Sequence, residues 1–507
     1  MISSLNLNKR LTAVIGIVCF ALAGGLPLSG QVVSPAQHAV FGDVFANPPE
    51  AHSPLALTAI NDPKTGQAAF EFGGREDPPV IRATPGEDIQ IAYANAMSAH
   101  SRETCVDGPC MNMTNLHFHG LHVSPDAPQD DAIDMMAMPG ETLHYLVNIP
   151  LDQPPGLYWY HTHPHGESYR QDLDGMSGAI VIEGIERYVP ELQHLREQIL
   201  VLRDRVVSKI DAASPALRSR VDIGAKTCGV STDTPERIFT VNGTVRPQIA
   251  IAPGERQFWR IVNASPDLYA DVQVDAEQLE IVALDGMPLA FHNPAHPKEF
   301  ARHILVPPAG RVEAIVTGPR AGTRASLRSL CFNTGRDGDP NPAMTLADLV
   351  DIPQTAQAIR ATPVNTRIPI SKPLPAALFA SVEKESPDFT VRFTEDKKGF
   401  YINDKKYGPT DPPMTTVAIG AFHHWRVTNN TQEVHPFHIH QVHFLVYAVN
   451  GVRLKRMEWL DTVNVPVEGN VDLVMDFTDP IIRGISLFHC HLLNHEDKGM
   501  MAKILFK

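Results

Sequence analysis

Apolar and polar residues alternate in short runs along much of the chain, and one such run occurs three times. Its copies begin at Gly86, Gly254 and Gly420, and in each copy an asparagine follows the glycine by nine residues. The alternation has a period of two, as in residues 424–427, which is typical of half-buried β-strands. The glycines are 168 and 166 residues apart. Because this spacing has the size of a domain, the pattern predicts three homologous domains.

Turn residues close these runs, and 43 prolines among 507 residues predict many short elements instead of long helices. Each domain is therefore predicted to be an all-β Greek-key sandwich or barrel. The boundaries are expected at about 185–198 and in a Pro-, Ala- and Thr-rich stretch at about 336–368. Residues 191–206 could form a short helix or a strand. The three tandem domains are placed at residues 40–185, 195–340 and 365–507.

The first 23 residues are typical of a secretory signal. Lys9 and Arg10 precede an apolar run at residues 11–23, which is shorter than the roughly 20 residues of a membrane-spanning helix. An uncleaved membrane anchor is the alternative, and the export route stays open because Lys9-Arg10 is not a twin-arginine pair. We therefore expect an exported protein, periplasmic or extracellular, with no stable membrane insertion after cleavage.

The charge of the chain argues against nucleic acid as a partner. There are 43 basic and 57 acidic side chains, a formal charge of -14, so no cationic field is available to bind phosphate backbones. An exported protein can form disulfides. Apart from Cys19 in the signal and Cys490, four cysteines allow three pairings. We favour the two pairs that stay within one domain, Cys105 with Cys110 and Cys228 with Cys331.

The chain contains four His-x-His pairs. On a strand, residues i and i+2 face the same side about 7 Å apart, so each pair presents two imidazoles to one surface. One such pair is weak evidence of a metal site, but four pairs in two repeated domains predict a site with eight ligands. The second domain has no pair, and we interpret it as a spacer. The pairs are His117 with His119, His161 with His163, His438 with His440, and His489 with His491.

Residues 156–163 match residues 484–491 position for position, but only the third domain has a cysteine between its two histidines. The pleat of a strand places this residue, Cys490, on the opposite face from those histidines, so one strand can serve two metal sites. Such continuity lets electrons enter singly at one site and collect at the other, as four-electron reduction of O2 to water requires. Nearby residues would complete the ligand set of a blue electron-transfer copper: His435, His495 and Met500.

These motifs strongly resemble those of the three-domain multicopper oxidases, the laccase-like enzymes, in their bacterial form. The resemblance covers nearly the whole mature chain, and the four motifs in this order are highly specific. It implies three cupredoxin-like domains and about four coppers per chain, one of type 1, one of type 2 and two of type 3. The motifs are His117-Phe118-His119-Gly120, His161-Thr162-His163, His435-Pro436-Phe437-His438-Ile439-His440, and the segment from His489 to Met500.

The resemblance also implies which residues bind each copper. The type 1 copper would be bound by His435, Cys490, His495 and Met500. The type 2 copper would be bound by His117 and His438. The type 3 pair would be bound by His119, His161, His163, His440, His489 and His491.

Carboxylates near the motifs are candidates for proton transfer. Glu496 matches a residue that relays protons in bacterial members, and an acidic residue after the first motif has a similar part. Asp130, Asp131 and Asp134 all fit that second position, and we choose Asp131. Asp461 resembles a position near the type 1 histidines, where it could touch a substrate or form a structural hydrogen bond. Four further histidines have no matching copper role and are interpreted as outer-sphere or surface residues: His122, His165, His424 and His443.

The resemblance implies an oxidase that takes single electrons from a small reducing substrate and reduces O2 to water. Phenols and aromatic amines are the favoured donors, and Cu(I), Fe(II) or Mn(II) are the alternative. The long methionine-rich insert of dedicated cuprous oxidases is absent from the third domain. A copper-free structural or division protein of the same fold is less consistent with a complete ligand set, and the third domain excludes a two-domain nitrite reductase. A monomer is favoured.

Overall fold

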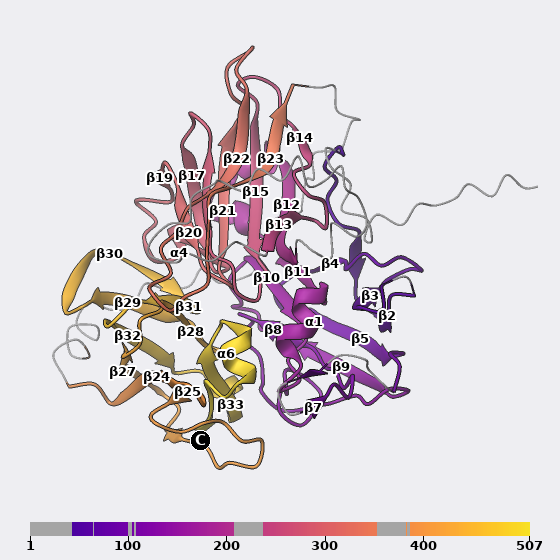
Figure 1. Cartoon of the computed structure of the whole chain (residues 1–507). Helices are drawn as coiled ribbons and strands as arrows, with labels where there is room; N and C mark the ends of the chain where they lie inside the picture. The colour runs from indigo at the N-terminus through magenta and orange to yellow at the C-terminus, as the bar shows by residue number, and fades with distance from the viewer. Residues whose placement is uncertain are drawn as a thin grey trace, which may run out of the picture. The chain divides into compact units, whose positions relative to one another are not determined.

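The computed structural model describes residues 43–63, 65–99, 104–105, 108–206, 237–351, 382 and 386–507 (Figure 1). The predicted signal, Cys228 and part of the predicted boundary at 336–368 lie outside these residues. In the described part of the chain, no helix is long and apolar enough to cross a bilayer. Strands dominate, and the helices there are short: α1 (Ser168–Asp174), η1 (Ile185–Arg187), η2 (Pro190–His194), α4 (Leu289–His292), η3 (Pro480–Ile482) and α6 (Leu493–Asp497).

The first domain has two main sheets in the described chain, whose apolar faces share one core. One sheet runs β3 (Ala68–Glu71), β2 (Leu55–Asn61), β5 (Asp88–Asn95), β9 (Thr142–Asn148). The other runs β1 (Glu50–His52), β4 (Val80–Ala83), β11 (Ser177–Ile182), β10 (Gly156–His161), β8 (His117–His119). A small hairpin of β6 (Thr104–Cys105) and β7 (Gly108–Pro109) lies beside the disulfide between Cys105 and Cys110. Cys331 is also disulfide-bonded.

The second domain repeats this plan around its own core. One sheet runs β13 (Arg237–Val241), β12 (Arg196–Val206), β15 (Arg256–Asn263), β21 (Arg311–Thr317), β17 (Leu279–Leu284), β18 (Met287–Pro288), with β19 (Glu299–Ala301) on β17. The other runs β14 (Gln248–Ala250), β23 (Met344–Val350), β22 (Ala325–Leu330), β16 (Ala270–Val274), β20 (Ile304–Val306). The ambiguous residues 191–206 therefore form the end of η2 and the strand β12.

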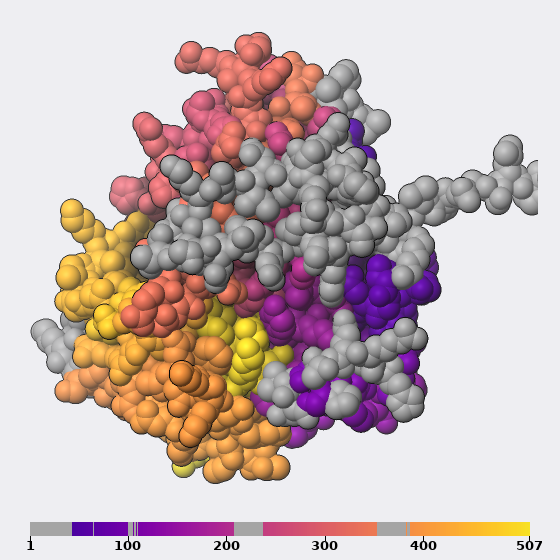
Figure 2. All heavy atoms as spheres, viewed as in Figure 1, coloured from indigo at the N-terminus to yellow at the C-terminus, as the bar shows by residue number. Residues whose placement is uncertain are grey.

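The third domain has the same two-sheet plan within the described residues. One sheet runs β25 (Gly399–Ile402), β24 (Phe389–Asp396), β27 (Ala421–Asn429), β32 (Asn470–Phe477), β29 (Phe444–Val449), β30 (Val452–Leu460). The other runs β26 (Thr415–Val417), β34 (Met501–Phe506), β33 (Gly484–Cys490), β28 (His435–Ile439), β31 (Thr462–Val465). In the space-filling view, the orange and yellow atoms of this domain form one continuous part of the surface (Figure 2).

The repeated glycine and asparagine have the same structural role in each domain. The three glycines have positive φ angles of 89°, 74° and 109°, which glycine adopts without strain. Each asparagine is buried, and its side-chain amide donates to two main-chain carbonyls from two separate segments that follow it in the chain. The repeat therefore marks the start and end of one central strand per domain: β5, β15 and β27.

One strand that was predicted to be half-buried, β15, is almost completely buried. The repeat predicts a half-buried strand at β15, but every residue after Arg256 is buried. The face that carries Arg260 is covered because neighbouring residues of β15 pack against other elements: Val262 lies in a cluster with Leu157 and Trp159 of β10. Arg260 itself forms ion pairs with Glu197 on β12 and Glu313 on β21. Burial of an arginine is tolerated when carboxylates compensate its charge. In β5, by contrast, exposed or half-exposed residues alternate with buried ones, as predicted.

Candidate metal centres

Two pairs of strands bring the four His-x-His motifs together. In the first domain, β8 pairs with β10 and His117 lies opposite His161. In the third domain, β28 pairs with β33 and His438 lies opposite His489. Rings from the two domains stack, and the ring centroids of His117 and His440 are 3.7 Å apart. All eight predicted histidines are buried and form what we call the histidine cluster: His117, His119, His161, His163, His438, His440, His489 and His491.

Many nitrogens of the histidine cluster have no hydrogen-bond partner among the described residues. Burial, the largest effect, and neighbouring histidines lower the pKa of these imidazoles well below 6.5, so they are neutral at pH 7. A buried polar atom without a partner is costly, and a metal ion would accept the lone pair. The donor set fits copper. The atoms are Nε2 of His117, His161 and His438, Nδ1 of His119, and both ring nitrogens of His491.

Main-chain carbonyls fix the orientation of several of these rings. Nδ1 of His161 and Nδ1 of His489 each lie 3.0 Å from a carbonyl oxygen, of Thr162 and Cys490 respectively. Nδ1 of His438 lies 2.8 Å from the carbonyl oxygen of Asp461. Because a carbonyl only accepts, each Nδ1 carries the proton and donates it, which leaves Nε2 for a metal.

A second centre lies on the opposite face of β33. Sγ of Cys490 is 3.4 Å from Nδ1 of His435 and 4.0 Å from Nδ1 of His495, and these two nitrogens are 3.3 Å apart. Cys490 belongs to the core of the third domain, whereas the two histidines that flank it belong to the histidine cluster. Burial raises the pKa of the Cys490 thiol well above its usual range. A bound metal ion would displace that proton.

Met500 lies beside this second centre. Its main-chain N–H donates to the carbonyl of His495 at 2.9 Å, and its carbonyl accepts the N–H of Cys490 at 3.1 Å. Its side chain is fully buried in the same core cluster as Cys490. Met501 belongs to a different cluster, with Ala132 and Leu487. The two adjacent methionines thus lie on opposite faces.

The choice of Asp131 requires a correction. The carboxylate of Asp131 accepts the main-chain N–H groups of Ile133 and Asp134, so it closes its own loop. Asp130 instead is buried, and its Oδ1 lies 3.0 Å from Nδ1 of His117. Burial raises the pKa of Asp130 to about 7, although hydrogen bonds from Phe118 and Gln441 oppose this. Asp130 is therefore the carboxylate that the loop presents to the histidine cluster.

Glu496 is at the cluster, as predicted. It lies on α6 and is fully buried, with Oε2 3.0 Å from Nδ1 of His489 and Oε1 3.6 Å from Nε2 of His163. Burial raises the pKa of Glu496, but the neighbouring imidazoles outweigh burial and lower it. Glu496 therefore contacts two members of the histidine cluster with its two carboxylate oxygens.

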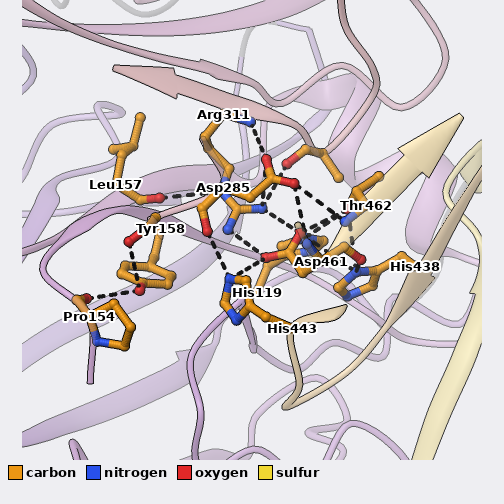
Figure 3. Close-up of polar contacts among 12 residues, drawn as sticks. His119, Pro154, Leu157, Tyr158, Asp285, Arg311, His438, His443, Asp461 and Thr462 are labelled. Carbon is orange, nitrogen blue, oxygen red and sulfur yellow. Dashed lines mark hydrogen bonds and ion pairs between the residues drawn. The ribbon is translucent and has the colours of Figure 1, made fainter. Parts of the chain in front are cut away.

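Asp461 lies against the histidine cluster, where it contacts His119 and His438 (Figure 3). It is fully buried, which favours the structural hydrogen bond over substrate contact. Three of the additional histidines also contact acidic partners: His122 lies 3.4 Å from Asp479, His424 lies 2.9 Å from Asp472, and His443 lies 3.6 Å from Asp461.

The sequence did not indicate two further contacts. Thr431 Oγ1 lies 2.8 Å from Nε2 of His435, and Arg311 of the second domain pairs with Asp461. Thr431 follows the repeated asparagine by two residues, so the repeat could have pointed to it. Arg311 is far in sequence from every histidine motif, so no sequence pattern pointed to it.

A cavity of about 570 Å³ opens beside the Cys490 centre and is lined partly by His495. Oε2 of Glu433 faces this histidine, 3.5 Å from its Nε2. Among the described residues that line the cavity, one is a lysine, Lys397, and six are acidic: Asp267, Asp337, Asp339, Glu395, Asp396 and Glu433.

Family comparison agrees with the geometry. Two models described as multicopper oxidase match residues 58–187 and 381–507, which together are just over half of the chain. These are the regions that contain the four histidine motifs. The chain belongs to the multicopper oxidase family, whose members bind copper in sites of types 1, 2 and 3.

The similar curated proteins are distant and carry several functional names. The multicopper oxidase mco of Staphylococcus aureus is 20% identical and spans 84% of this chain and 81% of its own. A laccase of Haloferax volcanii is 25% identical over 85% of this chain and 76% of its own. The iron transport multicopper oxidase fetC of Epichloe festucae is 25% identical over 85% and 72%.

Solved structures support the fold. The McoA multicopper oxidase of Aquifex aeolicus has a TM-score of 0.69 at 19% identity and covers 92% of this chain and 100% of its own. A multicopper oxidase of Campylobacter jejuni, described as a metallo-oxidase, has a TM-score of 0.67 at 22% identity and covers 93% and 97%. These likenesses confirm the predicted cupredoxin-like all-β fold.

Proposed function

We propose that this protein takes electrons singly from a reducing substrate at the Cys490 centre and passes them to the histidine cluster for reduction of O2 to water. The observation that carries the proposal is the position of Cys490, the last residue of β33, directly between His489 and His491. Bound copper would supply the one-electron redox steps at the first centre and the binding of O2 at the second.

The residues have distinct parts in this proposal. His435, Cys490, His495 and Met500 would hold the type 1 copper, and their burial keeps water from the thiolate. The orphaned nitrogens of the histidine cluster support its assignment to the other coppers. The type 2 copper would use His117 and His438. The type 3 pair would use His119, His161, His163, His440, His489 and His491.

Two buried carboxylates would transfer the protons that are consumed when O2 is reduced to water. With a pKa of about 7, Asp130 can hold a proton on its carboxylate at neutral pH and return it. Its Oδ2 accepts a hydrogen bond at 2.7 Å from Gln441, which in turn contacts Ser486. Glu496 lies beside His163 and His489 and would supply protons at the two motifs that contain these histidines.

The acidic cavity favours a metal cation as the electron donor over the phenols and aromatic amines that the sequence favoured. Because six carboxylates outnumber a single lysine, the cavity attracts cations. A neutral phenol gains nothing from these charges. Carboxylate oxygens suit Fe(II) or Mn(II) better than Cu(I), which prefers sulfur ligands. Glu433 connects the cavity to His495, so a bound cation would lie close to the Cys490 centre. The relatives named for iron transport and as a metallo-oxidase are consistent with this choice.

Oxygen consumption by copper-loaded protein tests both parts of the proposal. Fe(II), Mn(II), Cu(I) and a phenolic donor are compared side by side, with Glu395→Gln as the cavity variant and the exposed Glu87→Gln as its control. We expect turnover with Fe(II) or Mn(II), and a higher KM for the cation in Glu395→Gln alone. Turnover with the phenol only would refute the metal-cation assignment. No oxygen consumption with any donor would refute the oxidase itself.

A further inference from the structure

A buried arginine of the second domain contacts residues of the first and third domains beside the histidine cluster (Figure 3). Arg311 begins β21, and its side chain is fully buried. Its Nη1 donates to Oδ1 of Asp461 at 2.7 Å and its Nη2 donates to Oδ2 at 2.5 Å, while Nε donates to the carbonyl of Leu157 at 3.3 Å. Such a two-point pairing of guanidinium and carboxylate fixes direction as well as charge.

Asp461 in turn contacts two members of the histidine cluster. Its Oδ1 lies 3.2 Å from Nε2 of His119, and its carbonyl accepts from Nδ1 of His438 at 2.8 Å. These two rings, from the first and third domains, stack with centroids 3.8 Å apart. Because both acceptors lack protons, Nδ1 of His119 and Nε2 of His438 are left unprotonated and, in the described chain, without a partner. Asp461 thus decides which nitrogen of each ring is available to a metal.

The surroundings hold this pair in place. Asp285 of the second domain accepts the main-chain N–H of Arg311 at 2.8 Å and that of Asp461 at 3.3 Å. Gly120 directly follows His119, and a Cβ there would lie 2.5 Å from both Nη2 of Arg311 and Oδ2 of Asp461. Its φ of 84° is also unfavourable for other residues. The glycine of the first motif therefore leaves room for the ion pair.

We propose that Arg311 is a positioning residue of the histidine cluster: through Asp461, it orients His119 and His438 for copper. The second domain is then part of the centre that reduces O2 and not only a spacer. Without Arg311, the Asp461 carboxylate would be a buried charge without its counterion, and it would turn toward the imidazoles. This inference rests on the proposed oxidase function.

Arg311→Met removes the ion pair, and Arg311→Lys keeps the charge but loses the two-point geometry. Arg260→Met is the matched control, because Arg260 is an equally buried arginine of the same domain that pairs with Glu197 and Glu313. Copper content, visible absorption, the electron paramagnetic resonance signal of the type 2 copper, and kcat and KM are measured for each copper-loaded variant.

We expect Arg311→Met to change or lose the type 2 signal and to lower kcat roughly 10- to 100-fold, with a smaller effect in Arg311→Lys. The visible absorption and the KM for the donor should stay unchanged, since the Cys490 centre is not touched. Arg260→Met should keep the wild-type signal and kcat. Where Arg311→Met does not fold, the signal of Arg311→Lys decides the question.

A double-variant comparison separates positioning from a general loss of structure. In an Asp461→Asn background, Arg311→Met should lower kcat by less than about twofold more, because the arginine acts through that carboxylate. Fully multiplicative effects, or a wild-type type 2 signal in both Arg311 variants, would overturn the inference. A wild-type protein without blue absorption and without a type 2 signal would instead refute the proposed function.

Discussion

At the scale of single residues, Met500 and Met501 show how two adjacent, buried side chains differ in chemistry. Met500 shares a core with Cys490, and Met501 shares one with Leu487. A weak thioether ligand stabilises Cu(II), so Met500→Leu should raise the reduction potential of the blue copper. The packing cost should stay below about 1.5 kcal/mol because the two side chains have similar volumes.

Potentiometric titration of the two leucine variants checks this prediction. Met501→Leu is the internal control and should leave the potential at the wild-type value. A shift in Met501→Leu with none in Met500→Leu would show that the wrong methionine had been assigned.

Residue types and spacing predicted much of the site. The eight histidines of the cluster lie together, and Cys490 lies on the opposite face from the two histidines that flank it, because the two-residue period of a strand determines which side chains share a face. The choice between Asp130 and Asp131 could not be made in this way. Both lie in a loop, where hydrogen bonds to Phe118 and to residues 133 and 134 decide which carboxylate turns inward.

At the scale of elements, the repeated asparagine ties the end of a central strand to two segments that follow it in the chain. Asn263 donates to the carbonyls of Leu268 and Val306 and accepts the N–H of Ser265. Asn263→Ala would leave these buried groups unpaired and should lower the free energy of unfolding by about 2–4 kcal/mol.

Chemical denaturation measures this loss. Asn148→Ala is the control, since Asn148 is exposed and pairs with Asp88 at the surface, and it should change the free energy by less than about 0.5 kcal/mol. An equal, small effect of both substitutions would contradict the assigned part of the repeat.

The strand pattern predicted the all-β class and the central strand of each repeat, but it misjudged how deeply β15 is buried. Alternation reports only that two faces differ in polarity. In β15 the face that carries Arg260 packs against the first domain, and the arginine is paired with Glu197 of β12 and Glu313 of β21. Pairing of this kind joins residues 53 to 63 positions apart in sequence, so local periodicity does not show it.

At the scale of the whole molecule, Glu197 joins strands of two domains through Arg82 on β4 and Arg260 on β15. Burial raises its pKa, but the two guanidinium groups outweigh burial and lower the pKa from 4.5 to about 2. A lowered pKa in the folded state contributes stability above the unfolded value. That contribution, about 3 kcal/mol, is lost as the pH falls from about 4.5 to about 2.

Glu197→Gln should therefore be less stable than the wild type above pH 5, and the difference should shrink as the pH falls toward 2. Free energies of unfolding measured across this range test the prediction, with the exposed Asp152→Asn as control. A difference between wild type and Glu197→Gln that does not depend on pH would contradict the ion-pair account.

The sequence could not reveal the role of the second domain in the histidine cluster, because Arg311 belongs to no motif and contacts Asp461 only in the folded structure. The same holds for the acidic cavity, whose lining comes from residues 267–495. Long-range charge arrangements of this kind depend on how the loops pack, and spacing along the chain does not determine them.

The central claim is that the Cys490 centre delivers electrons to the histidine cluster. Fully reduced, copper-loaded wild-type protein and His438→Ala are mixed with O2, and the blue absorption is followed in time. The wild type should regain its blue colour within one turnover, whereas His438→Ala should stay bleached although its donor still reduces the blue copper. Reoxidation of both proteins at the same rate would contradict the account.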